Sequence, residues 1–275
     1  MKILFCGDVV GRSGRSVIEE NIPRLRDLLS LDFVIVNAEN AAHGFGLTPK
    51  MFEAFNRAGV DAMTMGNHTF DKKDIFDTLA DDEKLIRPLN YPEGTVGHGM
   101  SVFLLPDGRK VAVVQVLGRL FMRPFESPFS ALENLLENCV LGQDVQALIV
   151  DVHAEATSEK MALGFFCDGK ASLVAGTHTH IPTADAMILP NGTGFISDVG
   201  MCGDYYSIIG MTKETALPRF LNRDAIQASS EKTERLEPAE KEGTLCGVFV
   251  ETDDKTGKCL TIRPIRVGAH LIESL

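Results

Sequence analysis

The 275-residue sequence has no apolar run long enough to cross a bilayer. Its start, MKILFCGDVVG, lacks the extended apolar core of a signal peptide, so we expect the protein to be cytoplasmic and to have no membrane partner. None of the six cysteines belongs to a CxxC motif, and they are spread through apolar stretches. We therefore expect reduced, mostly buried thiols, and neither disulfides nor a cysteine zinc site.

Positive charge is also scarce, because 27 Lys and Arg face 38 Asp and Glu, which gives a formal net charge of −11. This balance argues against broad electrostatic binding to nucleic acid polymers or anionic membranes. A small phosphorylated substrate stays compatible with it, since bound metal ions can reverse the sign of the local field. Internal repeats, low-complexity tracts and linkers are absent from the sequence, so we expect one domain over residues 1–275.

Strand and helix patterns alternate over the first part of the chain, which indicates a parallel sheet. The expected strands there are KILFCGDVV, DFVIVNAEN and VDAMTMGNH. From Met100 onward, two apolar strands flank the turn PDG, and further strands precede His153 and His178. TLCGVFVETDD and KCLTIRPIRV should form a closing antiparallel pair, whereas residues 223–243 are polar and typical of a mobile excursion. These patterns predict a mixed sheet or two stacked sheets.

Polar side chains recur where the expected strands end. The stretch AGTHTHIP places His178 and His180 two residues apart, and strand periodicity would direct both to the same side. Functional residues of α/β folds gather at the carboxyl ends of strands. Each residue alone could be a helix cap, a turn residue or an ordinary rim histidine. Their recurrence at five strand ends favours a metal centre with these candidates: Asp8, Glu39, Asn40, Asn67, His153, His178 and His180.

Seven candidate ligands exceed the needs of one ion, so we expect two metal ions with one bridging carboxylate. Mixed carboxylate, carboxamide and imidazole ligands suit first-row metals, with iron expected and manganese as the alternative. Such a pair lowers the pKa of a bridging water to give hydroxide, and it clamps the oxygens of a phosphoryl group during in-line displacement.

The order of these motifs resembles the calcineurin-like metallophosphoesterases. The resemblance rests on GD after the first strand, GNH after the third, a histidine after a later strand, and GTHTH. Two positions depart from the broad family: Val10 replaces its usual histidine, and NAEN replaces its GDxxD motif. Both departures, together with GDVVG, NAENAAHGFGLT, MGNHTFD and DVGMCGDYYSIIG, are similar to the narrower branch of YmdB-like phosphodiesterases.

This resemblance implies a four-layer αββα sandwich, with two stacked mixed sheets flanked by helices, and a dinuclear iron-type site. It implies that Glu39 bridges the ions, and that the remaining ligands divide into two sets: Asp8, Asn40 and His180 for one ion, and Asn67, His153 and His178 for the other. Asn40 then replaces the ligand that is missing at Val10. The implied activity is hydrolysis of small phosphodiesters, notably 2′,3′-cyclic nucleotides such as those derived from RNA.

His68 follows a proposed ligand directly but has no metal assigned to it, so we expect it to be the general acid that protonates the leaving oxygen. The alternative is a histidine that merely hydrogen-bonds a ligand. Arg12 and His43 are candidates for substrate binding, although both could be incidental surface residues.

Two other functions stay open at this point. GDVVGRSG resembles a dinucleotide-binding turn, but it is not GxGxxG, and the three later histidines would then have no role. A regulatory or phosphate-binding protein that keeps the metal site without much turnover is the second alternative. The sequence is also compatible with a homo-oligomer.

Overall fold

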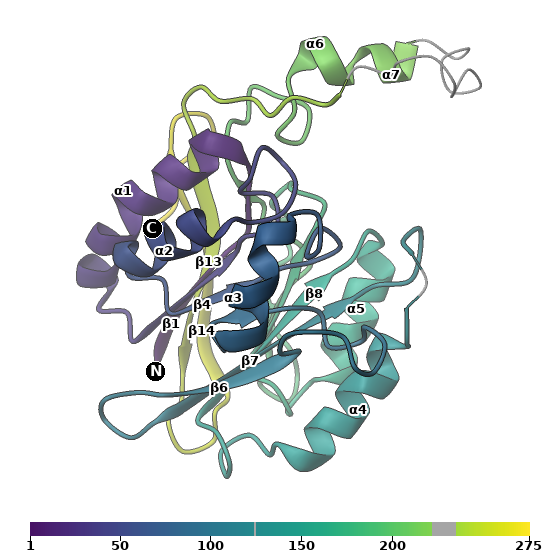
Figure 1. The fold of residues 1–275 in the computed structure, drawn as a ribbon. Helices are drawn as coiled ribbons and strands as arrows, with labels where there is room; N and C mark the ends of the chain where they lie inside the picture. Colours follow the sequence, from purple (N-terminus) through teal and green to yellow (C-terminus); the bar gives the residue numbers. More distant parts are fainter. Residues whose placement is uncertain (124, 222–234) are drawn as a thin grey trace.

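The computed structural model describes residues 1–123, 125–221 and 235–275, and two six-stranded sheets form its centre (Figure 1). The first sheet has the order β14 (Cys259–Gly268), β13 (Thr244–Thr252), β1 (Lys2–Cys6), β3 (Phe33–Asn37), β4 (Ala62–Thr64) and β5 (Leu85–Ile86). The second has the order β10 (Met187–Ile188), β11 (Gly194–Ile196), β9 (Leu173–Thr177), β8 (Ala147–His153), β7 (Lys110–Leu117) and β6 (Met100–Leu104).

Both sheets are mixed. Strands β1, β3, β4 and β5 run parallel, and β13 joins β1 in the antiparallel sense. In the second sheet, β7, β8, β9 and β11 run parallel between the antiparallel edge strands β6 and β10. The hairpin predicted around PDG is confirmed as β6 and β7, and the predicted closing pair is confirmed as β13 and β14. A small parallel pair, β2 (Asp8–Val9) and β12 (Met201–Cys202), lies beside the carboxyl end of β1.

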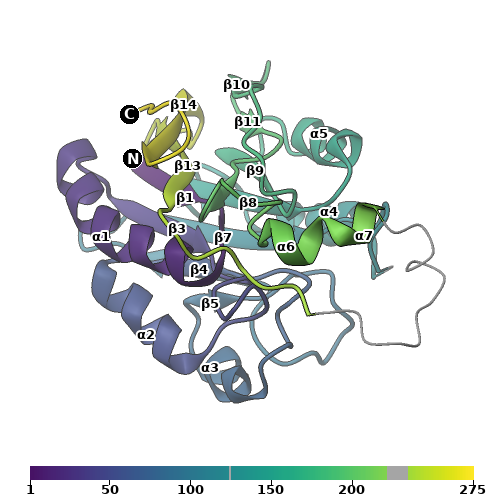
Figure 2. The same ribbon diagram turned by 90° about the horizontal axis from the view of Figure 1, so that it is seen from above.

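Helices cover the outer face of each sheet, as seen from above in Figure 2. The first sheet carries α1 (Gly11–Leu29), α2 (Pro49–Ala58) and α3 (Phe76–Asp81), the last preceded by the 3-10 turn η1 (Lys73–Ile75). The second sheet carries α4 (Pro128–Asn138) and α5 (Thr157–Phe166). Three separate hydrophobic clusters lie between these layers. The predicted four-layer αββα sandwich is therefore confirmed.

Strand periodicity explains how the middle layer is built. In β1, Ile3 and Phe5 point into the cluster between the sheets, whereas Leu4 and Cys6 point toward the helices. The inward positions stay apolar only up to the last residues of the strands. There the inward positions become polar, at Asn37 on β3, Thr64 on β4, Gln115 on β7, Asp151 and His153 on β8, and Thr177 on β9. The middle layer thus changes from apolar core to polar site at one end of both sheets.

The segment after β12 projects from this end. The segment KETALPRFL forms two short helices, α6 (Lys213–Ala216) and α7 (Pro218–Leu221), and Pro218 is the first residue of the second, where the missing N–H of proline costs no helical hydrogen bond. Of the predicted excursion over 223–243, residues 223–234 lie outside the described part of the chain. The following residues pair with the loop before α6, where Thr212 N–H donates to Glu237 O at 2.8 Å.

Two further observations concern the chain as a whole. All six cysteines are buried, and within the described ranges none is joined to another by a disulfide. Among the same residues, no helix has both the length and the apolar character that crossing a membrane requires.

Candidate metal centre

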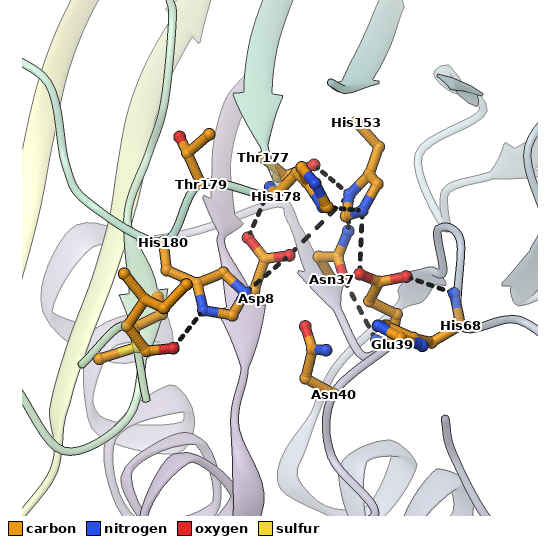
Figure 3. Close-up of polar contacts among 12 residues, drawn as sticks. Asp8, Asn37, Glu39, Asn40, His68, His153, Thr177, His178, Thr179 and His180 are labelled. Carbon is orange, nitrogen blue, oxygen red and sulfur yellow. Dashed lines mark hydrogen bonds and ion pairs between the residues drawn. The ribbon is translucent and has the colours of Figure 1, made fainter. Parts of the chain in front are cut away.

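The seven predicted ligands come together where the parallel strands end; Figure 3 labels six of them, and the seventh, Asn67, contacts His153. Asp8 lies on β2 and His153 is the last residue of β8, while the other five follow β3, β4 and β9. The side chains of Asp8, Glu39 and His153 are at most 1% exposed. Burying carboxylates and imidazoles so completely is costly unless they are paired or bind a cation.

One group of donor atoms converges on Nε2 of His153. This nitrogen lies 2.9 Å from Oε1 of Glu39, 3.0 Å from Oδ1 of Asn67 and 3.1 Å from Nδ1 of His178. Donor atoms bound to one ion at about 2.1 Å and at right angles to each other are separated by roughly 3 Å. The ligand atoms of Glu39, His153 and His178 also all lie within 4.8 Å of one another. This spacing fits a metal ion.

Asp8, Asn40 and His180 form a second group. Oδ1 of Asp8 and Oδ1 of Asn40 are buried and, among the described residues, have no hydrogen-bond partner. His180 Nε2 lies 3.7 Å from Oδ1 of Asp8, and His180 Nδ1 lies 2.8 Å from the carbonyl oxygen of Ile209. Because a carbonyl oxygen can only accept, Nδ1 carries the hydrogen and Nε2 is left to bind a cation. Two buried oxygens without partners also fit a cation, which would remove the cost of burying them.

The buried charges shift the pKa values of these groups in opposite directions. Burial raises the pKa of Asp8 to about 6, although His180 and His153 act against the shift. Burial also disfavours the charged form of Glu39, but the charge of His153 and hydrogen bonds from His153 and His68 lower its pKa to about 2. Burial and the neighbouring His153 lower the pKa of His178 to about 3. His178 is therefore neutral at pH 7. Burial disfavours the charged form of His153, but Glu39 and Asp8 outweigh this effect and raise the pKa of His153 to about 9, so a cation bound at its Nε2 would displace a proton.

The backbone at His178 and His180 differs from the prediction. Strand β9 ends at Thr177, and the two histidines follow with φ values of 89° and 67°, in the left-handed region. Strand periodicity therefore does not set the direction of these rings, although both histidines line the same cavity. The turn sends His178 toward His153, and it sends His180 toward Asp8.

A buried ion pair holds the residue between these two histidines. Oδ2 of Asp198 accepts hydrogen bonds from the backbone N–H of Thr179 at 3.1 Å and from Nζ of Lys160 at 2.8 Å. Lys160 Nζ also lies 3.2 Å from the Thr179 hydroxyl. Both charged side chains are almost completely buried. Since left-handed φ is unfavourable for non-glycine residues, these contacts keep the turn in its strained shape.

Sequence reasoning missed a polar network that lies beneath the ligands. Asp151 is fully buried, and its Oδ2 accepts from Thr64 Oγ1 at 2.6 Å, Gln115 Nε2 at 2.7 Å and Asn37 Nδ2 at 3.2 Å. Its Oδ1 accepts from the Thr177 hydroxyl at 2.6 Å. The signal was present in LIVDVH and VVQVL, where a polar residue interrupts an otherwise apolar strand.

This network also orients a proposed ligand. The oxygen of Thr177 lies 2.8 Å from Nδ1 of His153. Since the Thr177 hydroxyl gives its hydrogen to Asp151, it accepts one from Nδ1–H of His153. That hydrogen bond turns Nε2 of His153 toward Glu39, Asn67 and His178.

Gly66, which precedes Asn67, was also missed. A Cβ atom at this position would overlap Oε2 of Glu39 and lie 2.7 Å from Nε2 of His153. The signal for it is the glycine of the GNH motif. The absence of a side chain lets the backbone pass directly beside two proposed ligands.

His68 lies between the ligands and open space. Its backbone N–H donates to Oε2 of Glu39 at 2.9 Å, and its ring Nδ1 lies 2.7 Å from Oδ2 of Asp71. Its ring also meets that of Phe45 edge-on, with centroids 5.0 Å apart. Two cavities of about 590 and 330 Å³ are both lined by His68 and His178. His68 is therefore held at the centre by its backbone, while its ring faces the space that a substrate would occupy.

The two residues predicted to bind substrate lie farther out. The guanidinium of Arg12 is largely exposed, and its Nε lies 3.4 Å from Glu240. His43 is exposed, with a left-handed φ of 57°. Neither belongs to the described lining of the two cavities at His68. Their role in substrate binding stays a prediction.

Comparison with known proteins places this geometry in a family. The model of the family described as YmdB-like protein matches residues 4–265. The 2′,3′-cyclic-nucleotide 2′-phosphodiesterase of Bacillus subtilis (strain 168) is 45% identical over 268 residues, which are 98% of this chain and 97% of that protein.

Two crystal structures have the same fold. A hypothetical protein from Thermus thermophilus superimposes with a TM-score of 0.87 at 41% identity, over 98% of this chain and 99% of that one. A protein from Mycoplasma pneumoniae described as a novel phosphatase also gives a TM-score of 0.87, at 37% identity, over 98% and 93%. These matches confirm the resemblance inferred from the motifs: the chain belongs to the YmdB-like family, a branch of the calcineurin-like metallophosphoesterase enzymes.

Proposed function

We propose that this protein hydrolyses 2′,3′-cyclic nucleotides by opening the bond to the 2′ oxygen, which leaves a 3′-phosphate. The observation that carries the proposal is the pairing of two groups of buried donor atoms with a histidine, His68, that belongs to neither group. The name of the Bacillus subtilis relative supports the substrate and the bond. We propose further that residues 1–275 act as one metallophosphoesterase domain, since both sheets contribute to the site.

Two metal ions complete this proposal. Asn67, His153 and His178 would hold one ion, Asp8, Asn40 and His180 would hold the other, and Glu39 would contact both. The mixed oxygen and nitrogen donors suit iron, or manganese in its place. The chemistry that such a pair supplies when bound is a lowered pKa of coordinated water and neutralisation of charge at phosphorus.

The residues of the chain have distinct tasks in this reaction. The donor atoms would fix where the two ions lie, and thereby where the phosphate of the substrate would be held. Oδ2 of Asp71 lies 2.7 Å from Nδ1 of His68, and this contact directs Nε2 away from Asp71. His68 Nε2 then gives its proton to the 2′ oxygen as the bond to phosphorus breaks, so that the leaving group departs as a hydroxyl.

We also propose a cytoplasmic location. Six buried thiols that form no disulfide within the described residues are typical of a reducing compartment, and they support it.

Replacing His68 by alanine tests the reaction. General acid catalysis contributes about 10²–10⁴-fold in rate when the leaving group is a poor one such as a ribose hydroxyl. We expect the His68→Ala variant to keep its metal content and to lose rate in that range on 2′,3′-cyclic AMP. The loss should be much smaller on bis(p-nitrophenyl) phosphate, because p-nitrophenolate leaves without a proton.

The exposed His98 offers a matched control, and His98→Ala should behave as the wild type on both substrates. Metal content and both rates are measured in one preparation. Equal losses on the two substrates would remove the acid role from His68. A missing metal would make His68 a ligand, and a metal-loaded wild type without turnover would favour the binding protein considered above.

A further inference from the structure

An aromatic wall borders the proposed metal centre on one side. The cavity of about 590 Å³ is lined by Asn67, His68 and His178 at one end and by Phe70, Tyr91, Phe121 and Phe125 along its length. The Tyr91 ring lies 4.6 Å from that of Phe125 and 5.5 Å from that of Phe70, measured between centroids. The Tyr91 hydroxyl lies 3.4 Å from the carbonyl oxygen of Gly66. The rings of Phe70, Tyr91 and Phe125 are therefore packed against one another, and Tyr91 connects them to the backbone beside the proposed ligands.

Phe121 is the exposed member of this wall. Its side chain is 90% exposed, and its φ of 63° is in the left-handed region. A large apolar side chain in water and a strained backbone both cost free energy. A flat partner laid on this ring would recover the cost of exposure. The exposure and the backbone strain of Phe121 are therefore those expected of a residue whose ring contacts a bound ligand.

The second cavity at His68 is a poorer match for a flat ring. It measures about 330 Å³, and away from the ligands its apolar lining has one phenyl ring, Phe45, beside the aliphatic side chains of Ile209, Met211 and Leu236. The larger cavity offers four aromatic rings. A cyclic nucleotide whose phosphate lies at the metal centre must extend its base into one of the two, and the aromatic wall favours the larger.

We propose that the cavity lined by Phe70, Tyr91, Phe121 and Phe125 binds the nucleobase of the substrate, with the base stacked on Phe121. This inference rests on the proposed phosphodiesterase function and names the part of the substrate that the function leaves open. Stacking on a ring uses the π face that every base has, so it tolerates all four bases. The enzyme therefore distinguishes nucleotides from other cyclic phosphates rather than one nucleotide from another.

The test compares a substrate with and without its base. We expect Phe121→Ala to lower kcat/KM for 2′,3′-cyclic AMP about tenfold, the size of one stacking contact. The same variant should turn over ribose 2,3-cyclic phosphate, which has no base, at the wild-type kcat/KM. Binding of adenosine 3′-monophosphate, followed by calorimetry on the metal-loaded protein, should weaken by a similar factor.

Phe165 on α5 is the matched control, because its side chain is 55% exposed and it is not part of the described lining of this cavity. Phe165→Ala should leave all three measurements unchanged. Equal effects of Phe121→Ala on both cyclic phosphates, or no effect on either, would overturn the base-binding site. If the wild type cleaved neither cyclic phosphate but bound adenosine 3′-monophosphate through Phe121, the proposed reaction would fail while the base-binding site would stand.

Discussion

At Gly66 the backbone runs so close to Glu39 and His153 that one added carbon atom would overlap the first and crowd the second. Neither side chain can retreat easily, because both are buried and each also contacts a further proposed donor or His68. The spacing of the donor atoms therefore depends on Gly66, which has no side chain to bind a metal ion.

We predict that Gly66→Ala abolishes metal binding while the fold is kept. The added methyl group displaces the Glu39 carboxylate, and a ligand shifted by even an ångström no longer completes the site. Elemental analysis of the purified variant, together with circular dichroism, measures both effects.

Gly94→Ala provides the control for a glycine substitution as such. Gly94, unlike Gly66, has a positive φ, of 80°, and among the described residues no atom lies within 4 Å of an added Cβ. That variant should lose about 1 kcal/mol of stability from backbone strain and keep its metals. If Gly66→Ala bound metal as the wild type does, the close approach would have no functional meaning.

The candidate ligands could be found from the sequence because their position depends on a simple rule. Parallel strands end at one edge, so Asp8, Glu39, Asn67 and His153 could be grouped without knowing any distance. The rule does not extend to the turn after β9. Its left-handed histidines depend on Lys160 and Asp198, which are 38 positions apart in the chain and were not connected by any local pattern.

At the scale of elements, this ion pair joins α5 to the loop after β11. Lys160 lies on α5, and Asp198 follows β11 and accepts a hydrogen bond from the backbone N–H of Thr179. A helix on the outer layer thereby controls the turn that carries two proposed ligands.

We predict that Lys160→Met lowers the free energy of unfolding by about 3–5 kcal/mol, because it leaves the Asp198 carboxylate buried without its cation. The double variant Lys160→Met with Asp198→Asn should regain a large part of that loss, since it removes the unpaired charge. Urea denaturation of the wild type, both single variants and the double variant gives the coupling. Additive losses would show that the two groups act independently.

At the scale of the whole molecule, Asp151 connects the two sheets. It accepts hydrogen bonds from Asn37 and Thr64 on the first sheet and from Gln115 and Thr177 on the second. Strand periodicity could show that each of these residues points inward. It could not show that the two polar ends face each other, because the sequence does not give the way the sheets stack.

We predict that Asp151→Ala weakens both the fold and the metal centre. Each buried donor that loses its acceptor costs about 1–3 kcal/mol, and the Thr64 and Thr177 hydroxyls are the most affected. His153 loses its orientation as well, so metal affinity should fall about 10–100-fold. Thermal unfolding with and without metal separates the two effects.

Asp151→Asn keeps the volume and one acceptor oxygen, and it should lie between the wild type and the alanine variant in both measurements. An Asp151→Ala variant with full metal affinity would mean that His153 needs no support from Thr177.

The order of the first sheet determines when this site can exist during synthesis. Strand β1 lies between β3 and β13, and Lys2 pairs with Glu251. A ribosome adds roughly 5–20 residues per second, so β1 waits on the order of ten seconds or longer before its second neighbour emerges. During the first part of that interval Asp8 is already made, but the turn that carries His178 and His180 lacks its ion pair until Asp198 has been added. Metal capture therefore follows translation of at least the first 198 residues, which include all seven proposed ligands and the ion pair that holds the turn.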